Sequence, residues 1–171
     1  MRKYAIMTAG FVLCFSAVVF GQAVDSPFQV RFTTSLKKQD AIHITNTGAN
    51  NTSLCANVYG LATSGTLLGC CSCVVPTNGL VSLSLKDDVL ENLKPLPKAM
   101  VLKIMGSSGT SGNCNPAAVG SGSDIFVTGM VAWKGEAAFA PSTLSAGELA
   151  RLTSQCGSLH ATPNICAACR P

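Results

Sequence analysis

The chain has 171 residues, of which 47% are hydrophobic and only 12% are charged, with a formal net charge of +4. Soluble globular domains carry about 25% charged residues on average, so the composition excludes a polyelectrolyte, a coiled coil and a long charged tail. The hydrophobic fraction is high enough to build a core and excludes disorder over the whole chain. A chain of this length is expected to form one domain.

The N-terminus has the three parts of a secretory signal peptide. Two basic residues open the chain, and an uncharged, largely apolar stretch follows over Ala5–Phe20. The sequence Gly21-Gln22-Ala23 then has small residues at the two positions that a signal peptidase reads. The apolar stretch is shorter than the about 20 residues that span a bilayer as a helix. We expect cleavage after Ala23, which leaves residues 24–171 as a single domain without a stable membrane span. An uncleaved membrane anchor is the alternative.

The charges that remain after cleavage form no patch. Ten basic and eight acidic side chains give residues 24–171 a net charge of +2, and no more than two basic residues are consecutive. Nucleic-acid binding requires clustered Lys and Arg side chains. We therefore expect no nucleic-acid partner.

Eight cysteines remain after the predicted cleavage: Cys55, Cys70, Cys71, Cys73, Cys114, Cys156, Cys166 and Cys169. An even number of cysteines in an exported chain predicts disulfides, here four, although the count does not give their connectivity. Successive side chains of a strand point to opposite faces. Cys70 and Cys71 should therefore not pair with each other, and Cys71 and Cys73 should share a face.

A metal site is the alternative use of four of these cysteines. Cys71 and Cys73, together with Cys166 and Cys169, could supply four thiolates, a ligand set that suits zinc or Cu(I). The spacing Cys-Cys-Ser-Cys is not usual for zinc, and export favours oxidation of the thiols. We expect no metal and no cofactor.

Apolar and polar residues alternate with a period of two along most of the chain, which is typical of β-strands. The seven predicted strands lie at Phe28–Thr34, Ile42–Thr45, Leu54–Tyr59, Thr66–Val75, Leu80–Leu85, Met100–Ile104 and Ile125–Trp133. Turn residues separate them, most clearly Asn78-Gly79. Seven short strands of this kind predict a mainly β protein, an antiparallel immunoglobulin-like sandwich.

Two helices are expected between and after the strands. Acidic residues early and Lys94 late suit a short helix over Asp87–Lys94. Ser145 and Glu148 form a capping-box pattern at the start of a helix over about 145–156, with Gly157 as its stop.

The stretch Gly106–Ser123 contains five glycines and five serines. A long segment of this composition is a surface loop or a binding loop. A disulfide at Cys114 would tether it to the rest of the domain.

No catalytic set is recognisable in the sequence. His43 alternates with isoleucines and should face solvent, and His160 lies in a loop, with no acid at a diagnostic spacing from either. The acidic residues Asp87, Asp88 and Glu91 are explained by a helix N-terminus. Trp133 ends the last predicted strand on the side of Val127 and Val131 and is expected to pack in the core or at an edge. Aromatic residues are too few to argue for a sugar platform. We therefore expect no enzyme and no catalytic residues.

The segment Asp40–Leu85 resembles a group of uncharacterised secreted, cysteine-rich bacterial proteins. The resemblance rests on Gly69-Cys-Cys-Ser-Cys73 followed by the turn Pro76-Thr-Asn-Gly79. The turn departs slightly from the Thr-Pro-Asn-Gly order of that group. The resemblance implies export and no assigned activity.

These observations predict a secreted or periplasmic protein with a structural or binding role at the cell surface or outside the cell. Its partner would be a protein or a surface, and no motif specifies which. One alternative is a thiolate metal-binding protein. Self-assembly is a further option, in which Phe28–Thr34 adds to the sheet of a neighbour instead of pairing within its own sheet.

Overall fold

The computed structural model describes residues 26–34, 41–91, 93–108, 114–119, 125–160 and 165–169. The predicted signal peptide and its cleavage site lie outside these ranges. So do most of the glycine- and serine-rich residues of the predicted loop over Gly106–Ser123.

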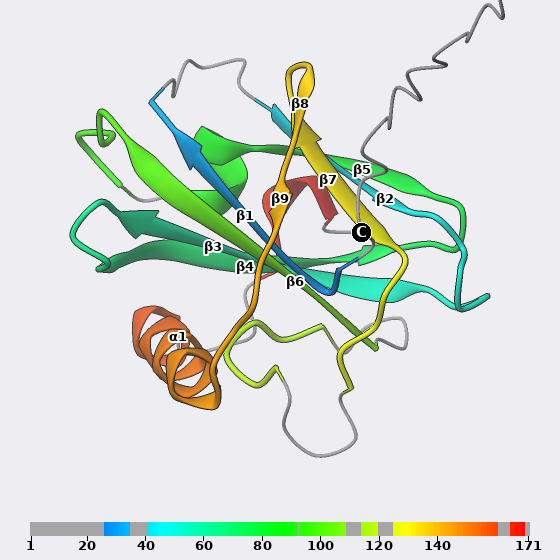
Figure 1. Ribbon diagram of the computed structural model, residues 1–171. Coiled ribbons are helices and arrows are strands. Elements are labelled where there is room, and N and C mark those ends of the chain that lie inside the picture. Colours follow the sequence, from blue (N-terminus) through cyan, green and yellow to red (C-terminus); the bar gives the residue numbers. More distant parts are fainter. Residues whose placement is uncertain are drawn as a thin grey trace, which may run out of the picture.

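The described residues form two antiparallel sheets that pack face to face (Figure 1). The first sheet has the order β4 (Leu67–Val75), β3 (Leu54–Ala62), β6 (Met100–Ser108), β1 (Phe28–Thr33) and β9 (Ala140–Pro141). The second has the order β5 (Leu80–Ser84), β2 (Ala41–Asn46), β7 (Met130–Lys134) and β8 (Ala137–Ala138).

The predicted antiparallel sandwich is confirmed, and its seven main strands are found. The strand order of an immunoglobulin domain is not found. That order would place the first, second, fifth and fourth strands in one sheet, whereas here β2 and β5 lie in the second sheet. The last predicted strand also starts later, at Met130, because Gly129 turns the chain with a φ of +95°. Ahead of it, Phe126 makes only an isolated bridge to Ser107.

The main hydrophobic core lies between the two sheets. It is built from the inward-facing side chains of both, with Ile42, Ile44, Leu83, Leu102 and Ile104 among its fully buried members. These residues alternate with outward-facing ones along their strands, as the sequence period predicts.

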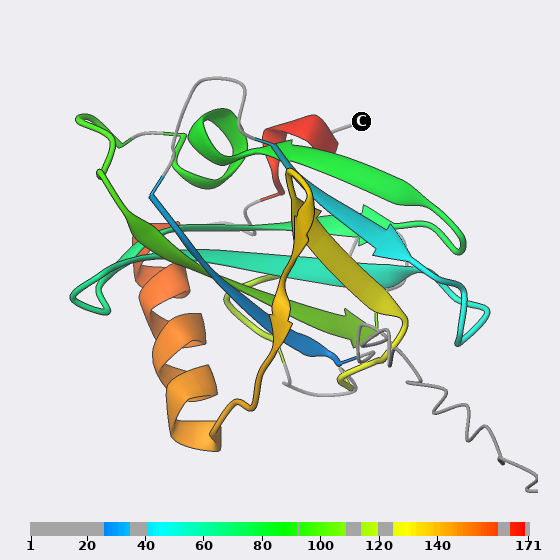
Figure 2. The same cartoon turned by 45° about the horizontal axis from the view of Figure 1, so that its top comes forward.

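A second core lies on the outer face of the first sheet. The helix α1 (Ala146–Leu159) covers that face, and its Leu152 and Cys156 pack with Tyr59 and Met105 (Figure 2). Strands β3 and β4 are therefore buried on both faces along most of their length. In the described part of the chain, no helix has the length and apolar character needed to cross a membrane.

The predicted C-terminal helix is present with corrected bounds, whereas the other predicted helix is replaced by a single turn. Ser145 caps α1 and accepts the Glu148 N–H at 3.1 Å, as predicted. The helix continues past Gly157 to Leu159, because glycine only weakens a helix that is held elsewhere. The helix expected over 87–94 is instead one π-helical turn, η1 (Leu85–Val89). It starts earlier because the Ser84 side chain accepts the Asp87 N–H.

Four disulfides join the eight cysteines, as predicted. Cys71–Cys166 and Cys73–Cys169 lie on one face of β4 and hold the C-terminal residues, which include the short helix η2 (Ala167–Cys169). Cys70–Cys156 lies on the other face and holds α1, and Cys55–Cys114 tethers the segment 114–119. The predicted tether and the predicted facing of Cys70, Cys71 and Cys73 are thus confirmed.

The first predicted strand pairs within its own sheet. β1 aligns with β6 over its whole length and with β9 at Gln29 and Val30. The buried Gln29 side chain also links the two sheets. Its amide donates to the Met130 carbonyl at 2.5 Å and accepts the Ala132 N–H at 3.0 Å. Self-assembly through Phe28–Thr34 stays a prediction, and in this chain β1 already has neighbours on both sides.

Candidate functional site

A cleft of about 240 Å³ lies beside β4, the edge strand of the first sheet. One wall is the end of η1 and the residues after it, and the other wall is the C-terminal end of α1. The lining residues are Leu68, Gly69, Val89, Leu90, Glu91, Leu93, Leu159 and His160. Five of these eight residues are leucine or valine, so the cleft can take an apolar group of a ligand.

Two glycines allow the cleft wall to sit where it does. Gly60 and Gly69 are directly opposite each other in β3 and β4. A β-carbon at Gly69 would overlap the carbonyl oxygen of Val89, and one at Gly60 would meet the side chains of Met100 and Val89. Glycine inside a strand often marks the close approach of another backbone. Here it lets the end of η1 lie directly on the sheet.

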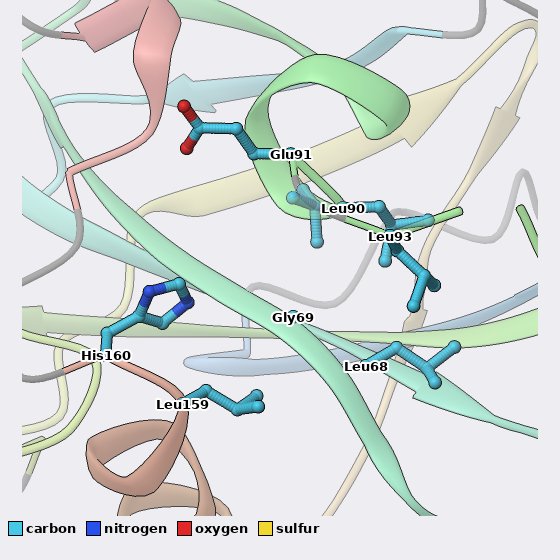
Figure 3. Close-up of a pocket in the computed structure, with 8 residues that line it drawn as sticks. Leu68, Gly69, Leu90, Glu91, Leu93, Leu159 and His160 are labelled. Carbon is cyan, nitrogen blue, oxygen red and sulfur yellow. The ribbon is translucent and has the colours of Figure 1, made fainter. Parts of the chain in front are cut away.

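The cleft also contains two ionisable side chains, Glu91 and His160. Figure 3 shows them on opposite sides of the β4 ribbon, with leucine side chains beside them. The sequence assigned Glu91 to a helix start and His160 to a loop, and it did not predict that they line one cleft. Neither Ser, Thr nor Cys is among the lining residues, so the described lining supplies no side-chain nucleophile of the usual hydrolase type.

The walls of the cleft are fixed by buried polar contacts and a disulfide. The Asp88 carboxylate accepts the Ser84 N–H and the Ala168 N–H, each at 2.6 Å, and so ties η1 to η2. Figure 2 shows these two short helices side by side. On the other side, Cys70–Cys156 ties β4 to α1. Such a cleft is pre-formed, which lowers the entropic cost of binding.

The four cysteines predicted as alternative metal ligands do lie together, but as two disulfides. The α-carbons are 4.9 Å apart in Cys71–Cys166 and 5.6 Å apart in Cys73–Cys169. A thiolate is the form of cysteine that binds a metal, and oxidation removes it. In the ranges that the structure describes, no group of three or more His, Cys, Asp or Glu side chains is placed to hold a metal ion.

His43 lies on the outer face of the second sheet, as predicted. Its Nδ1 is 2.8 Å from Ser82 Oγ, and its ring lies 5.6 Å from that of Trp133. No carboxylate of the described residues forms an ion pair with His43. The Ser82–His43 pair therefore lacks the third group that orients the base in a Ser-His-Asp triad. Trp133 packs on this outer face and not in the core, because it shares the face of His43.

Of the predicted loop, the residues 106–108 belong to strand β6, so the loop starts later than predicted, and the segment 114–119 packs against the first sheet instead of standing free. The Tyr59 hydroxyl donates to the Pro116 carbonyl at 2.6 Å, and the Ser72 hydroxyl donates to the Cys114 carbonyl at 3.0 Å. Burial raises the pKa of the Tyr59 hydroxyl, so Tyr59 stays a proton donor. The segment 114–119 thus acts as a cover, and the binding-loop alternative concerns residues outside the described ranges.

Comparison with known proteins adds no family. No protein-family model matches the chain, and neither a curated protein nor a solved structure does. The resemblance to secreted cysteine-rich proteins stays a prediction.

Proposed function

We propose that this chain is a non-catalytic binding protein that works in an oxidising compartment, secreted or periplasmic, and takes an apolar group of its ligand in the cleft beside β4. The observation that carries the proposal is the cleft itself. It is lined mainly by leucine and valine and framed by β4, η1 and the end of α1.

The disulfides support the proposal that the chain works in an oxidising compartment. Four disulfides in a chain of 171 residues are typical of exported proteins and rare in the cytosol. Each disulfide contributes about 2–4 kcal/mol to stability. Three of the four bond to β4, the strand that floors the cleft, so the frame of the cleft is held covalently.

The proposal predicts that replacing Leu159 with glutamine weakens binding to the cleft about 5-fold. Leu159 lines the cleft and is 49% exposed, so the change removes apolar contact with the ligand and leaves the core intact. Partial burial of one leucine side chain is worth about 1 kcal/mol. Binding would be measured by NMR titration with small apolar probes, from isobutanol to N-acetyl-leucine amide.

Leu80 provides the matched control. It is 55% exposed and lies on β5, outside the cleft, so Leu80→Gln should leave the titration unchanged. Equal losses in both variants would indicate non-specific adsorption. If no probe shifts the resonances of the cleft residues in the wild-type protein, the proposed function is wrong.

A second candidate function is metal binding by the reduced chain. It is favoured by one observation, that the structure brings Cys71 and Cys73 opposite Cys166 and Cys169.

Intact mass spectrometry of the purified protein, native and denatured and without reductant, separates the two functions. We expect a chain that starts at Val24, is lighter than the reduced form by two hydrogens for each of the four disulfides, and carries no metal. A native mass that includes zinc or copper, with hydrogens retained on these four cysteines, would instead support the metal-binding function.

A further inference from the structure

The lining of the cleft beside β4 is divided into an apolar part and a polar part. Leu68 and Leu93 are partly buried and pack against the main core, so the apolar part continues the core outward. Glu91 is exposed and His160 is half-buried. In Figure 3 the Glu91 carboxylate and the His160 ring lie toward the left, whereas Leu68 and Leu93 lie toward the right. A ligand that fills the cleft therefore meets leucine side chains at one end and ionisable side chains at the other.

The polar part of the lining contains an acid and no strongly basic side chain. Glu91 supplies a carboxylate, and none of the eight described lining residues is a lysine or an arginine. The neighbouring acid Asp88 is buried, and its carboxylate already accepts two backbone N–H groups. Glu91 is thus the acid that a ligand meets. A carboxylate has about four lone-pair sites, so Glu91 can accept a donor of the ligand in addition to a contact within the chain.

An ammonium group is the head group that complements this end of the cleft. It has a positive charge and three N–H donors, and both a carboxylate and the ring of a neutral histidine offer acceptors. A hydroxyl head group could donate one hydrogen bond but would gain no attraction between charges. A carboxylate head group would place a second negative charge beside Glu91, and like charges held together are unfavourable.

The volume of the cleft limits the apolar part of the ligand. A cavity of about 150 Å³ holds benzene, and drug-sized ligands fill pockets of about 300–1,000 Å³. The cleft has about 240 Å³ and lies between these values. A hexyl chain is therefore a suitable probe of its apolar part.

We propose that the cleft beside β4 binds an amphiphilic primary amine, whose alkyl chain lies among the leucine side chains and whose ammonium group pairs with Glu91. The proposal rests on the proposed function, because it names the class of ligand that the same cleft takes. Glu91 is exposed, so the ion pair keeps its contact with water and avoids the large desolvation cost of a buried pair.

Three probes that share a hexyl chain and differ in their head group test the proposal. At pH 7 hexylamine is a cation, hexanol is neutral and hexanoate is an anion. Each would be titrated into the wild-type protein at low salt and followed by the NMR shifts of the cleft residues. An exposed ion pair is worth up to about a factor of five in affinity. We therefore expect hexylamine to bind about 3- to 5-fold more tightly than hexanol, and hexanoate to bind more weakly than hexanol.

Glu91→Gln tests whether this carboxylate causes the preference. Glutamine keeps the size of the side chain and removes its charge, so the advantage of hexylamine should disappear while the affinity for hexanol stays the same. Glu136→Gln is the matched control, because Glu136 is exposed on the turn between β7 and β8 and lies outside the cleft. It should leave the preference unchanged. Salt at about 1 M should shrink the preference of the wild-type protein, because salt screens exposed charges.

Four results would overturn the proposal. Equal affinities of the wild-type protein for hexylamine and hexanol would show that the cleft does not select a cation, while the proposed function would stand. Tightest binding of hexanoate would show that His160, and not Glu91, selects the head group. Equal losses in Glu91→Gln and Glu136→Gln would indicate a general effect of surface charge. If none of the three probes shifts the resonances of the cleft residues, the proposed function is wrong as well.

Discussion

Replacing Gly69 with alanine is expected to lower the free energy of unfolding by about 3 kcal/mol. The added β-carbon would overlap the carbonyl oxygen of Val89 and lie 3.1 Å from its carbonyl carbon. Both are backbone atoms, so no side-chain rotation relieves the clash. Overpacking of a core costs about 1–3 kcal/mol, and a backbone obstacle places this site at the upper end. Urea unfolding followed by the fluorescence of Trp133, the single tryptophan of the chain, measures it.

The control for this change is Gly147→Ala. A β-carbon at Gly147 would have nothing within 4 Å, and the residue lies in the first turn of α1. Alanine there should raise stability by about 0.5–1 kcal/mol, because it restricts the unfolded chain and favours the helix. If Gly69→Ala proved as stable as the wild-type protein, the end of η1 could not lie on β4 as described, and the cleft would lose its wall.

The features that depend on local sequence were predictable. The period of two located the main strands, and the inward residues Ile42 and Ile44 are fully buried. The serine cap of α1 and the facing of the β4 cysteines follow from the geometry of one element. Each of these needs only neighbouring residues.

The burial of the outer face of the first sheet was not predicted from periodicity. Asn57 and Tyr59 occupy positions that alternation assigns to solvent, yet both are fully buried, because α1 and the segment 114–119 cover them. That cover comes from residues more than fifty positions away. The signal that was present is cysteine, since Cys55 and Cys70 share this face and each required a partner above the sheet.

The burial of strand β1 was also not predicted from periodicity, here because the face expected to be exposed carries a buried residue. Its alternation suggests that the phenylalanines are buried and the polar residues exposed, but Phe32 is 57% exposed while Gln29 is buried. Gln29 faces inward because its side-chain amide hydrogen-bonds to the backbone of β7, at Met130 and Ala132, as a neighbouring strand would. A hydrophobic pattern cannot detect a polar side chain that acts as a backbone substitute.

The cleft was not predicted because it depends on three elements that are distant in sequence. Glu91 and His160 both line it only because η1 and α1 end beside β4. A signal was available in Gly60 and Gly69, two glycines inside strand patterns, which indicate a close backbone approach. The element that approaches could not be identified without the pairing of β3 with β4.

The second large effect is expected for Asp88→Asn, which should lower the free energy of unfolding by about 2–4 kcal/mol. Asp88 is 4% exposed, and its two carboxylate oxygens accept one backbone N–H each, from Ser84 and from Ala168. Hydrogen bonds to a charged group contribute about 1.5–3 kcal/mol. Asparagine keeps one acceptor and turns its NH₂ group toward the other N–H, so one buried donor faces another donor.

Measuring which residues Asp88→Asn affects distinguishes the loss of the two Asp88 hydrogen bonds from a general loss of stability. Hydrogen exchange should accelerate most at the amides of Ser84 and Ala168, which join η1 and η2 to the carboxylate. Asp87 is the matched control, because it is the exposed neighbour on the same turn and Asp87→Asn makes the same change of charge. It should cost less than about 1 kcal/mol, as expected for an exposed polar contact. Equal losses in the two variants would show that negative charge at η1, and not the two hydrogen bonds of Asp88, stabilises this end of the fold.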